Sequence, residues 1–375
     1  RLDKGGDLMD LIDVMKDISD NPAISDLHLT GKQKPVIRYN GKLKYYEDYP
    51  EDLGIQEVAD IARDLMDDNQ WEEFLEKGEV DFSHSVPGYC RFRVNAFRQR
   101  GSVSLALRVI PGDIPTVDEL GLPQILKKLA MQRKGLVLCT GPTGSGKSTT
   151  LASMINVVNQ NRSAHIITLE DPIEYLHSHH KSIVHQREVG HDTLNFANGL
   201  RAALRQDPDV ILVGEMRDLE TISIALEASE TGHLVFATLH TNDAPSTVER
   251  IIDVFPAHQQ QQVRIQLASS ISGIISQQLL PRKDGSQRVA ALEILIATSA
   301  VRNIIREGKT HQLVSAMQTG GKYGMIMMNN YLVDLYNQGL IEYDEAVRRA
   351  DDPEYVKKKI SGRILIPGGR FFRWH

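Results

Sequence analysis

Residues 141–148 constrain this chain more than any other segment, because they read Gly-Pro-Thr-Gly-Ser-Gly-Lys-Ser directly after the apolar run 135–140. The pattern G-x-x-x-x-G-K-S between a strand and a helix is typical of a loop that binds nucleotide phosphates. Its glycines allow backbone N–H groups to turn toward phosphate oxygens. The helix expected over 147–158 adds its positive amino-terminal end. We therefore predict nucleotide binding within an α/β fold.

Each part of the loop is expected to have its own task. Lys147 reaches the β- and γ-phosphates, and the Ser148 hydroxyl is a ligand of Mg²⁺. The predicted ligands are thus ATP and Mg²⁺. The residues expected to hold the nucleotide are Gly141, Pro142, Thr143, Gly144, Ser145, Gly146, Lys147, Ser148 and Thr149.

Length and composition set the outer limits of the prediction. At 375 residues the chain exceeds one ordinary core, so two domains are expected. The net charge of −6 argues against a nucleic-acid-binding surface. No stretch reaches the roughly 18 apolar residues of a membrane span, and no signal peptide is visible. Cys90 and Cys139 lie in apolar runs and indicate a reducing compartment, so we expect a cytoplasmic protein.

Residues 1–112 are predicted to form a mixed α and β domain, followed by a linker over 113–118. Strand-like alternation, helical spacing and the turn dipeptide Asn40-Gly41 carry this prediction. The expected elements are a helix around 8–15, a strand over 25–30, a hairpin of 36–39 and 42–45, a helix over 53–78, and a hairpin of 88–97 and 103–110.

Strands alternate with helices in the next part of the chain, which predicts a parallel doubly wound sheet in an ATPase core over 119–290. The expected strands are 136–140, 165–169, 210–213 and 234–239, and the expected helices between them are 147–158, 195–205 and 219–230. After residue 248 we expect mostly helix, over 263–279, 300–306, 330–338 and 343–350. The region 291–360 is therefore predicted to be helical, and 361–375 to be a flexible tail.

Acidic residues end two of the predicted strands. Glu215 follows the strand 210–213, which is expected to lie beside the phosphate loop, so Glu215 can orient and deprotonate the attacking water. Gly214 stands where an aspartate is common, so Glu170 is expected to hold Mg²⁺ through a water molecule instead. The alternative for each acid is a solvated residue at a strand end.

Histidines and arginines supply further candidates. His233 and His240 bracket the strand 234–239, and His240, at its carboxyl end, is expected to sense the γ-phosphate. In the N-terminal hairpin, Arg93 and Arg108 lie on paired strands. Such basic residues can act as fingers on the phosphates of a neighbouring subunit. A solvated strand face is the alternative.

These motifs together resemble the secretion-type ATPase superfamily and, within it, the type IV pilus retraction ATPases (PilT family), over about residues 8–350. The matching parts are the phosphate loop (141–148), an acidic box (168–174), a Walker B segment (210–218) and a histidine box (231–242). Residues 300–307 resemble the family motif Ala-Ile-Arg-Asn-Leu-Ile-Arg-Glu, with aliphatic exchanges at Val301 and Ile304. We expect a short helix here, with Val301, Ile304 and Ile305 inward and Arg302, Arg306 and Glu307 outward.

The resemblance implies a homohexameric ring in which each subunit has a PAS-like N-terminal domain and a RecA-like ATPase domain, with nucleotide between them. It implies ATP hydrolysis that drives pilus retraction and twitching motility through the inner-membrane platform protein, at the inner face of the cytoplasmic membrane. It makes Glu215 the general base. It gives supporting or nucleotide-contacting roles to Glu170, His233, His240, Arg93 and Arg108.

Several alternatives stay open. Residues 187–193 suit an accessory, PilU-like retraction ATPase equally well, and such a paralogue is also a possible partner. A regulatory nucleotide-binding module with little turnover is a second alternative, and a nucleic-acid translocase is disfavoured by the acidity. Pilus assembly is disfavoured because two distant cysteines cannot form the four-cysteine zinc module usual in extension ATPases. The 300–307 motif favours the retraction motor.

Overall fold

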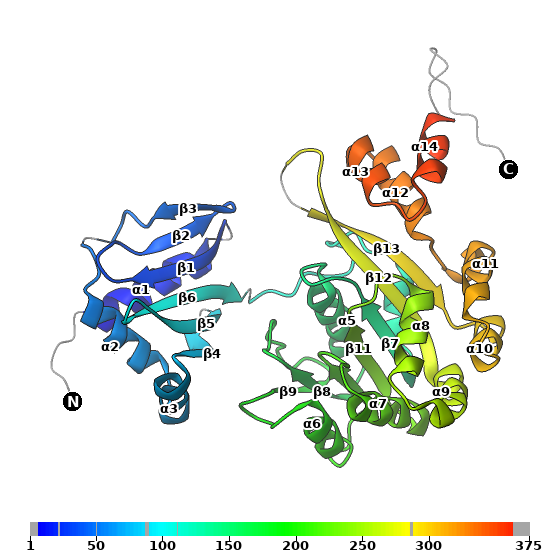
Figure 1. Ribbon diagram of the computed structural model, residues 1–375, viewed down its shortest axis with the longest axis horizontal. Helices are drawn as coiled ribbons and strands as arrows, with labels where there is room; N and C mark the ends of the chain where they lie inside the picture. Colours follow the sequence, from blue (N-terminus) through cyan, green and yellow to red (C-terminus); the bar gives the residue numbers. More distant parts are fainter. Residues whose placement is uncertain are drawn as a thin grey trace. The chain divides into compact units, whose positions relative to one another are not determined.

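The computed structural model describes residues 7–21, 23–49, 51–86, 90–110, 112–285 and 288–362. The chain divides into two compact units (Figure 1), the first spanning Arg1–Ile114 with Pro172–Leu176 and the second spanning Pro115–Asp171 with His177–His375. The flexible tail predicted for 361–375 lies, from residue 363 onward, outside the described residues.

The N-terminal unit is built on one six-stranded antiparallel sheet with the order β3-β2-β1-β6-β5-β4. Both predicted hairpins, β2–β3 and β5–β6, are present. The elements are α1 (Asp7–Asp20), β1 (Ile24–Thr30), β2 (Val36–Tyr39), β3 (Lys42–Tyr45), α2 (Ile55–Leu65), α3 (Asp68–Lys77), β4 (Glu79–Val86), β5 (Cys90–Gln99) and β6 (Ser102–Ile110).

Two expectations for this unit need correction. The helix predicted over 53–78 is two helices, because the backbone is extended at Met66 and Asp67 then caps α3 by accepting a hydrogen bond from the Gln70 N–H at 2.8 Å. Strand β4, where Val80 and Phe82 alternate inward, was not predicted. Helices α1 to α3 bury their apolar sides with one face of the sheet in a single core. The opposite face carries charged residues that include Asp26, Arg93 and Arg108.

The larger unit contains a seven-stranded sheet with the order β13-β12-β7-β11-β10-β8-β9, in which only β13 runs antiparallel to its neighbour. The elements are α4 (Ile125–Ala130), β7 (Gly135–Thr140), α5 (Lys147–Asn161), β8 (His165–Glu170), β9 (Ile183–Glu188), α6 (Phe196–Ala203), β10 (Val210–Val213), α7 (Leu219–Thr231), β11 (Leu234–Leu239), α8 (Ala244–Asp253), α9 (Ala257–Ser270), β12 (Ile271–Pro281) and β13 (Arg288–Ile296).

Helices cover both faces of this sheet, as a doubly wound fold requires. Residues of α4 and α5 share one core with the strands, and residues of α6 to α9 share the core on the opposite face. Figure 1 labels α5 to α9 around the sheet. The predicted α/β class is therefore confirmed. The helix predicted over 263–279 is wrong, because α9 ends at Ser270 and the chain continues as the buried strand β12. Strands β12, β13 and β9 were not predicted.

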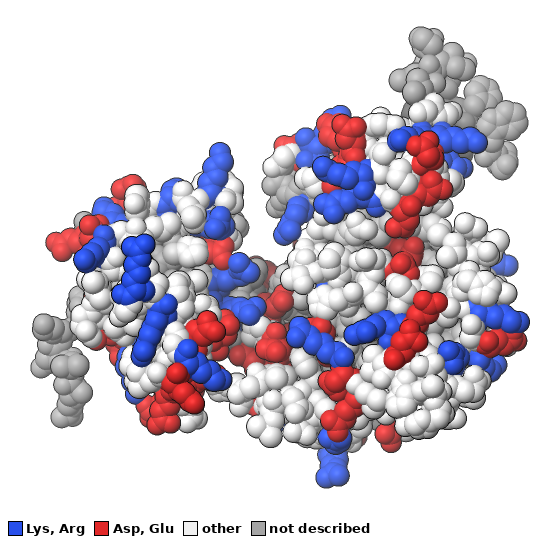
Figure 2. All heavy atoms as spheres, viewed as in Figure 1, with Lys and Arg blue, Asp and Glu red and all other residues white. Residues whose placement is uncertain are grey.

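The chain after β13 is helical. The helical region predicted over 291–360 therefore starts too early, because residues 291–296 are the second half of β13, which pairs with β12. It forms α10 (Ser299–Arg306), η1 (Thr310–Gln312), α11 (Leu313–Gln318), η2 (Gly321–Tyr323), α12 (Met328–Asn337), α13 (Tyr343–Arg348) and α14 (Pro353–Ser361). The last three helices share a small apolar core with β12 and β13. Within the described part of the chain, no helix has the length and apolar character needed to cross a membrane. On the face shown in Figure 2, cationic and anionic side chains are interspersed over both units.

Candidate nucleotide site

The phosphate loop connects β7 to α5 at the carboxyl edge of the parallel sheet. Its three glycines all have positive φ, of 142° at Gly141, 77° at Gly144 and 86° at Gly146. Side chains with a Cβ atom rarely adopt these values, which explains why the loop needs glycine at each position. Within the loop, the Ser145 N–H donates to the carbonyl oxygen of Pro142 at 3.2 Å. The result is a tightly curled backbone.

Strand β12 supports the loop through a residue that was not predicted. The Gln277 side-chain amide donates to the carbonyl oxygen of Ser145 at 2.7 Å, and its oxygen accepts a hydrogen bond from the Thr150 hydroxyl at 2.7 Å. A Cβ atom at Gly141 would clash with the Gln277 carbonyl oxygen. This contact was not predicted from the sequence. Residues 263–279 were expected to be helical, and Gln277 lies far from the loop along the chain.

The polar groups of the loop suit a phosphate ligand. The Lys147 Nζ donates to two carbonyl oxygens of its own loop, those of Gly141 at 2.8 Å and Pro142 at 3.0 Å. Among the described residues, the buried Ser145 hydroxyl has no hydrogen-bond partner. Ser148 and Thr149 are half-buried in the first turn of α5. The predicted residues therefore form one cradle with a lysine and hydroxyl groups.

Glu215 lies just beyond β10 and meets His240, which follows β11. His240 Nε2 lies 3.1 Å from Glu215 Oε1, and Arg217 Nε lies 2.5 Å from the same oxygen. Burial alone would raise the pKa of the Glu215 carboxyl, but the hydrogen bond from Arg217 and the charges of His240 and Arg217 outweigh it and lower the pKa. Glu215 is therefore ionised at neutral pH. Arg217 was not predicted, although it stands only two residues further along.

The position of β10 corrects one expectation. The strand that ends before Glu215 was predicted to lie beside the phosphate loop, but β11 lies between β10 and β7. All three strands are parallel and end at the same edge of the sheet. Glu215 and His240 consequently reach the edge that carries the loop, with His240 on the strand next to it. Glu215 and His240 were predicted to lie at this edge, and they do so because the strands before them are parallel.

Gly214 and Glu170 lie next to one another on neighbouring strands. A Cβ atom at Gly214 would lie 3.0 Å from the Leu169 carbonyl oxygen and 3.3 Å from the Glu170 Cα, which leaves little room for an aspartate. Glu170 Oε1 accepts hydrogen bonds from the Thr168 hydroxyl at 2.6 Å and the Gln186 amide at 3.1 Å. Glu170 is thus held at the carboxyl edge, where an oxygen donor suits Mg²⁺.

His233 lies at the other edge of the sheet, at the amino end of β11. Its Nδ1 lies 2.9 Å from the carbonyl oxygen of Ala228, and its own carbonyl accepts from the Gly135 N–H at 3.0 Å. These contacts tie the end of α7 to the start of β7. The structure therefore does not bring His233 together with Glu215 and His240, and a supporting catalytic role for it stays a prediction.

A buried carboxyl, that of Glu293, lies on β13 beside the start of α8. Glu293 pairs across the sheet with Ser276, is 4% exposed and accepts a hydrogen bond from the Ala244 N–H at 2.9 Å. Burial, with smaller contributions from Asp243 and Asp351, raises its pKa to about 7. Since Ala244 begins α8, Glu293 anchors the segment that follows His240.

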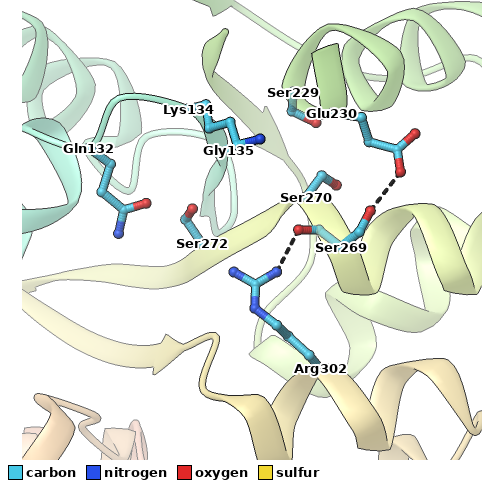
Figure 3. Close-up of a pocket in the computed structure, with 9 residues that line it drawn as sticks. All are labelled: Gln132, Lys134, Gly135, Ser229, Glu230, Ser269, Ser270, Ser272 and Arg302. Atoms are coloured by element: carbon cyan, nitrogen blue, oxygen red, sulfur yellow. Dashed lines mark hydrogen bonds between the residues drawn. The ribbon is translucent and has the colours of Figure 1, made fainter. Parts of the chain in front are cut away.

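The helix α10 carries the 300–307 motif and is anchored through Arg302. Val301 and Ile305 are buried as expected, but Arg302 does not point outward. Its Nη1 donates to the carbonyl oxygen of Ala268 at 2.7 Å and to that of Ser269 at 2.7 Å, at the end of α9. Figure 3 shows the contact with Ser269. Arg302 also lines a cavity of about 390 Å³ with residues from the starts of β7 and β12. The guanidinium thus satisfies carbonyls that a helix end leaves unpaired.

The predicted finger residues lie together on the exposed face of the N-terminal sheet. Arg93 and Arg108 are directly opposite each other on β5 and β6, and Arg108 is opposite Asp26 on β1, which is opposite Arg38 on β2. We call these four residues the charged row. The side chain of Arg108 is 68% exposed and that of Arg93 is 45% exposed. Two arginines directly opposite each other destabilise a sheet unless nearby carboxylates offset their charges.

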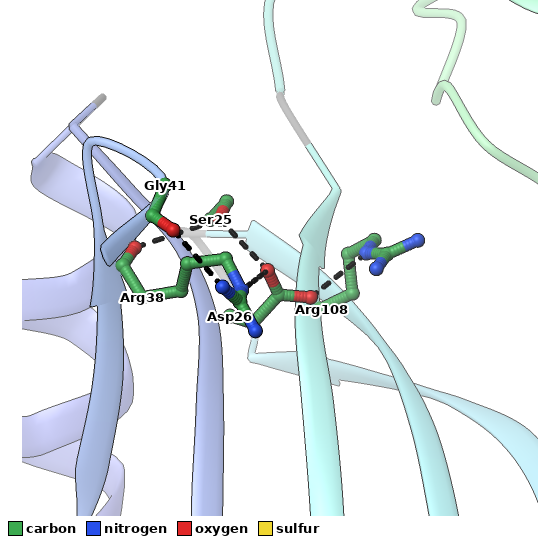
Figure 4. Close-up of polar contacts among 5 residues, drawn as sticks. All are labelled: Ser25, Asp26, Arg38, Gly41 and Arg108. Atoms are coloured by element: carbon green, nitrogen blue, oxygen red, sulfur yellow. Dashed lines mark hydrogen bonds and ion pairs between the residues drawn. The ribbon is translucent and has the colours of Figure 1, made fainter. Parts of the chain in front are cut away.

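Asp26 lies between Arg38 and Arg108 in the charged row (Figure 4). Its Oδ1 accepts from Arg108 Nε at 2.9 Å, and its Oδ2 accepts from the Ser25 hydroxyl at 2.7 Å and lies 3.6 Å from Arg38 Nε. Burial would raise the pKa of Asp26, but the hydrogen bonds from Ser25 and Arg108 outweigh it and lower the pKa. A charged Asp26 therefore holds an arginine on each side. Asp81 lies 3.8 Å from Arg93 Nε.

Comparison with known proteins identifies the family. The model of the type II/IV secretion system protein family matches residues 82–338. The chain belongs to this family. The PilT protein of Pseudomonas aeruginosa, named a type IV pilus retractation ATPase, is 48% identical over 346 residues, covering 92% of this chain and 99% of that protein. The type IV pilus ATPase PilU of the same organism is 44% identical over 336 residues, covering 90% and 87%.

A solved structure agrees with these sequence relatives. The crystal structure of the pilus retraction motor PilT with bound ADP is 50% identical and has a TM-score of 0.86, covering 93% of this chain and 99% of that one. The resemblance to pilus retraction ATPases that the motifs indicated is thereby confirmed. The similarity to this PilT structure extends over both units of the chain.

Proposed function

We propose that this protein is a hexameric motor that hydrolyses ATP to retract type IV pili and so powers twitching motility. The proposed partner is the inner-membrane platform protein, which places the motor at the cytoplasmic face of the inner membrane. One observation carries the proposal: a glycine-rich loop with Lys147 shares a sheet edge with the paired Glu215 and His240. The family membership and the similarity to retraction ATPases support it.

The loop residues bind the nucleotide in this proposal. Its backbone N–H groups and Lys147 hold the phosphates of ATP, with Lys147 exchanging the carbonyl oxygens of Gly141 and Pro142 for phosphate oxygens. Ser148 and Glu170 are the oxygen donors for Mg²⁺, Glu170 acting through a water molecule. The metal ion neutralises part of the phosphate charge.

Glu215 acts on the water that attacks the γ-phosphate. A carboxylate with a lowered pKa is a weak proton acceptor, so Glu215 first orients the water and takes its proton as phosphoryl transfer proceeds. His240 contacts the same carboxylate and connects it to the end of β11, next to the loop strand. Arg93 and Arg108 complete the site by stabilising charge on the phosphates of a neighbouring subunit.

Turnover of the purified protein tests this assignment. Glu215→Gln keeps the shape of the side chain but cannot accept the proton, so we expect ATP hydrolysis to fall by about 10²- to 10⁴-fold while ADP still binds. Glu227→Gln, an exposed acid on α7, is the matched control and keeps wild-type turnover. Undiminished hydrolysis in Glu215→Gln would remove this residue from its role.

An accessory retraction ATPase is the second candidate, because the similarity to PilU is nearly as high as that to PilT. Both assignments predict ATP hydrolysis, so they differ in the cell rather than in the test tube. Loss of a principal motor leaves excess surface pili, whereas loss of an accessory motor leaves normal pilus numbers and weaker movement. A regulatory module would show negligible turnover even with the platform protein present.

A further inference from the structure

The Gln277 side chain connects β12 to the phosphate loop and is almost completely buried, with 2% of its surface exposed. Its amide nitrogen donates to the Ser145 carbonyl oxygen at 2.7 Å, and its amide oxygen accepts from the Thr150 hydroxyl at 2.7 Å. The Ser145 carbonyl can only accept, so the NH₂ group of Gln277 must face it. The Ser145 carbonyl therefore fixes the orientation of the amide, and the Thr150 hydroxyl donates to the oxygen at the other end.

This contact determines which way one peptide of the loop points. In a trans peptide the C=O and the following N–H point in opposite directions. Because Gln277 draws the Ser145 carbonyl toward β12, the N–H of Gly146 is turned away from β12. Gly146 directly precedes α5, where a phosphate ligand is bound by backbone N–H groups. Gln277 thus orients a donor that faces the ligand without touching the ligand itself.

The glycines of the loop pack against the same residue. A Cβ atom at Gly146 would lie 2.8 Å from the Gln277 amide nitrogen, and one at Gly141 would clash with the Gln277 carbonyl oxygen. The beginning and the end of the loop therefore rest on one residue of β12. Thr150, in the second turn of α5, completes the connection between strand, loop and helix.

We propose that Gln277 is a positioning residue for nucleotide binding, which holds the phosphate loop in its binding shape. This inference rests on the proposed binding of ATP at the loop. Loss of the Gln277 amide lowers the affinity for nucleotide. The loop would no longer be held in shape beforehand, so the cost of ordering it would arise when the ligand binds. Turnover at saturating ATP changes little, since Glu215 and His240 lie on other strands.

Four variants of the full-length protein test the role of Gln277. Gln277→Leu removes both hydrogen bonds at similar volume, and Thr150→Val removes the donor at the other end. Thr150→Ser keeps that donor and serves as the conservative partner. Ser276→Ala is the matched control on β12. It removes the buried hydrogen bond that Ser276 accepts from Thr140 of β7 at 3.0 Å and leaves both hydrogen bonds of Gln277 in place. Titration with Mg²⁺–ADP measures affinity, and hydrogen exchange over 141–148 measures loop order.

We expect Gln277→Leu to weaken ADP affinity about tenfold and to speed exchange in the loop. Thr150→Val moves both readouts in the same direction by a smaller factor, whereas Thr150→Ser and Ser276→Ala bind as wild type does. Unchanged ADP affinity in folded Gln277→Leu overturns the inference, and so does an equal loss in Ser276→Ala. If Gln277→Leu does not fold, equal affinities in the two Thr150 variants overturn it.

The same titration separates this inference from the proposed function. A wild-type protein that does not bind ADP contradicts the proposed function, whatever the variants do. A wild-type protein that binds ADP, together with variants that bind equally well, contradicts only the positioning role of Gln277.

Discussion

The phosphate loop and the charged row, the two regions assigned to phosphate contact, hold their functional groups in opposite ways. The loop is fixed by buried hydrogen bonds between uncharged groups, with Gln277 below it and glycines at positive φ within it. In the charged row, Arg93 and Arg108 project from an exposed sheet face and are held by ion pairs with Asp81 and Asp26.

The difference follows from what each region must do. A buried network loses its hydrogen bonds at high cost, so the loop keeps one shape before the nucleotide arrives. The Arg93–Asp81 pair is exposed on both sides, and Arg108 is exposed although its partner Asp26 is buried. Ion pairs with such exposed arginines contribute little, and the arginine can exchange its carboxylate for another anion. The loop is therefore preorganised, whereas the proposed function requires the arginines to exchange their carboxylates for a phosphate of the neighbouring subunit. Four predictions, ordered from the largest expected effect to the smallest, sharpen or break this comparison.

The largest effect is expected from removing the arginines. Arg93→Ala and Arg108→Ala should each lower ATP turnover by about 10³-fold, because finger arginines stabilise charge in the transition state. The free energy of unfolding should change by less than about 1 kcal/mol for Arg93→Ala, because that pair is exposed on both sides. Arg108→Ala should cost somewhat more, because it removes a hydrogen bond from the buried Asp26. Lys42→Ala, an exposed cation on β3, is the control. Activity assays and denaturant unfolding measure the two quantities.

A mixing experiment tests whether the arginines act between subunits. Arg93→Ala subunits should partly restore turnover to Lys147→Ala subunits in mixed rings, because each supplies the part that the other lacks. Mixed rings no more active than dilution predicts would contradict the finger assignment.

The second prediction compares two glycines of the loop. Gly141→Ala must place a methyl group against the Gln277 carbonyl at a φ of 142°, and we expect it to cost about 3 kcal/mol of unfolding free energy or more. Gly144→Ala is the matched control, because a Cβ atom there meets no atom within 4 Å and only the φ of 77° is strained. That strain costs about 1 kcal/mol. Equal costs would show that the loop is not held against β12.

The third prediction concerns pH and Glu293. Its folded-state pKa is raised from 4.5 to about 7, so the folded protein binds the proton more tightly than the unfolded chain does. The contribution of Glu293 is therefore most favourable below about pH 4.5 and is lost as pH rises to about 7, by up to about 1.4 kcal/mol per pH unit. The whole loss is on the order of 3 kcal/mol. Asp243 and Asp351 face the same group and raise its pKa further.

Glu293→Gln removes this titration, so its unfolding free energy should vary less between pH 5 and 7 than that of the wild type. Urea unfolding at a series of pH values measures the slope. Glu342→Gln, an exposed acid on the surface, controls for the loss of one charge. The same slope in wild type and Glu293→Gln would contradict the assignment.

The smallest effect is expected at Asp26. Asp26→Asn removes the charge between Arg38 and Arg108 and should cost about 1 kcal/mol of unfolding free energy, less at high salt. The pKa of Asp26 is lowered, so its contribution is present above the ordinary carboxyl pKa and is lost as the pH falls below it. Salt-dependent unfolding measures the effect. A larger cost for Asp26→Asn than for Gly141→Ala would reverse the comparison between the two regions.

The sequence predicts best where chemistry is local. The loop pattern, its strand and its helix are contiguous, and their geometry is as expected. The meeting of Glu215 with His240 was also accessible, because both follow parallel strands and so reach one edge. Alternating burial along β5 likewise places Arg93 on the predicted exposed face.

The remaining features depend on contacts distant in sequence. Strand β12 is buried on both faces, so its apolar run has no alternation and continues the pattern of α9. Because β12 was predicted to be helical, the role of Gln277 was missed. Its partners Ser145 and Thr150 also lie more than 120 residues earlier in the chain. Arg302 was placed outward because helical periodicity cannot reveal that a cation caps the end of another helix.

Surface pilus number is the measurement that tests the central claim most directly. It would be compared between the wild type, a strain lacking the gene and a strain carrying Glu215→Gln, with twitching scored alongside. The account predicts excess pili without twitching in both mutant strains, because pili are assembled but not retracted. Loss of pili would contradict it by indicating an assembly motor, and normal pilus numbers with weakened movement would assign the protein to the accessory class.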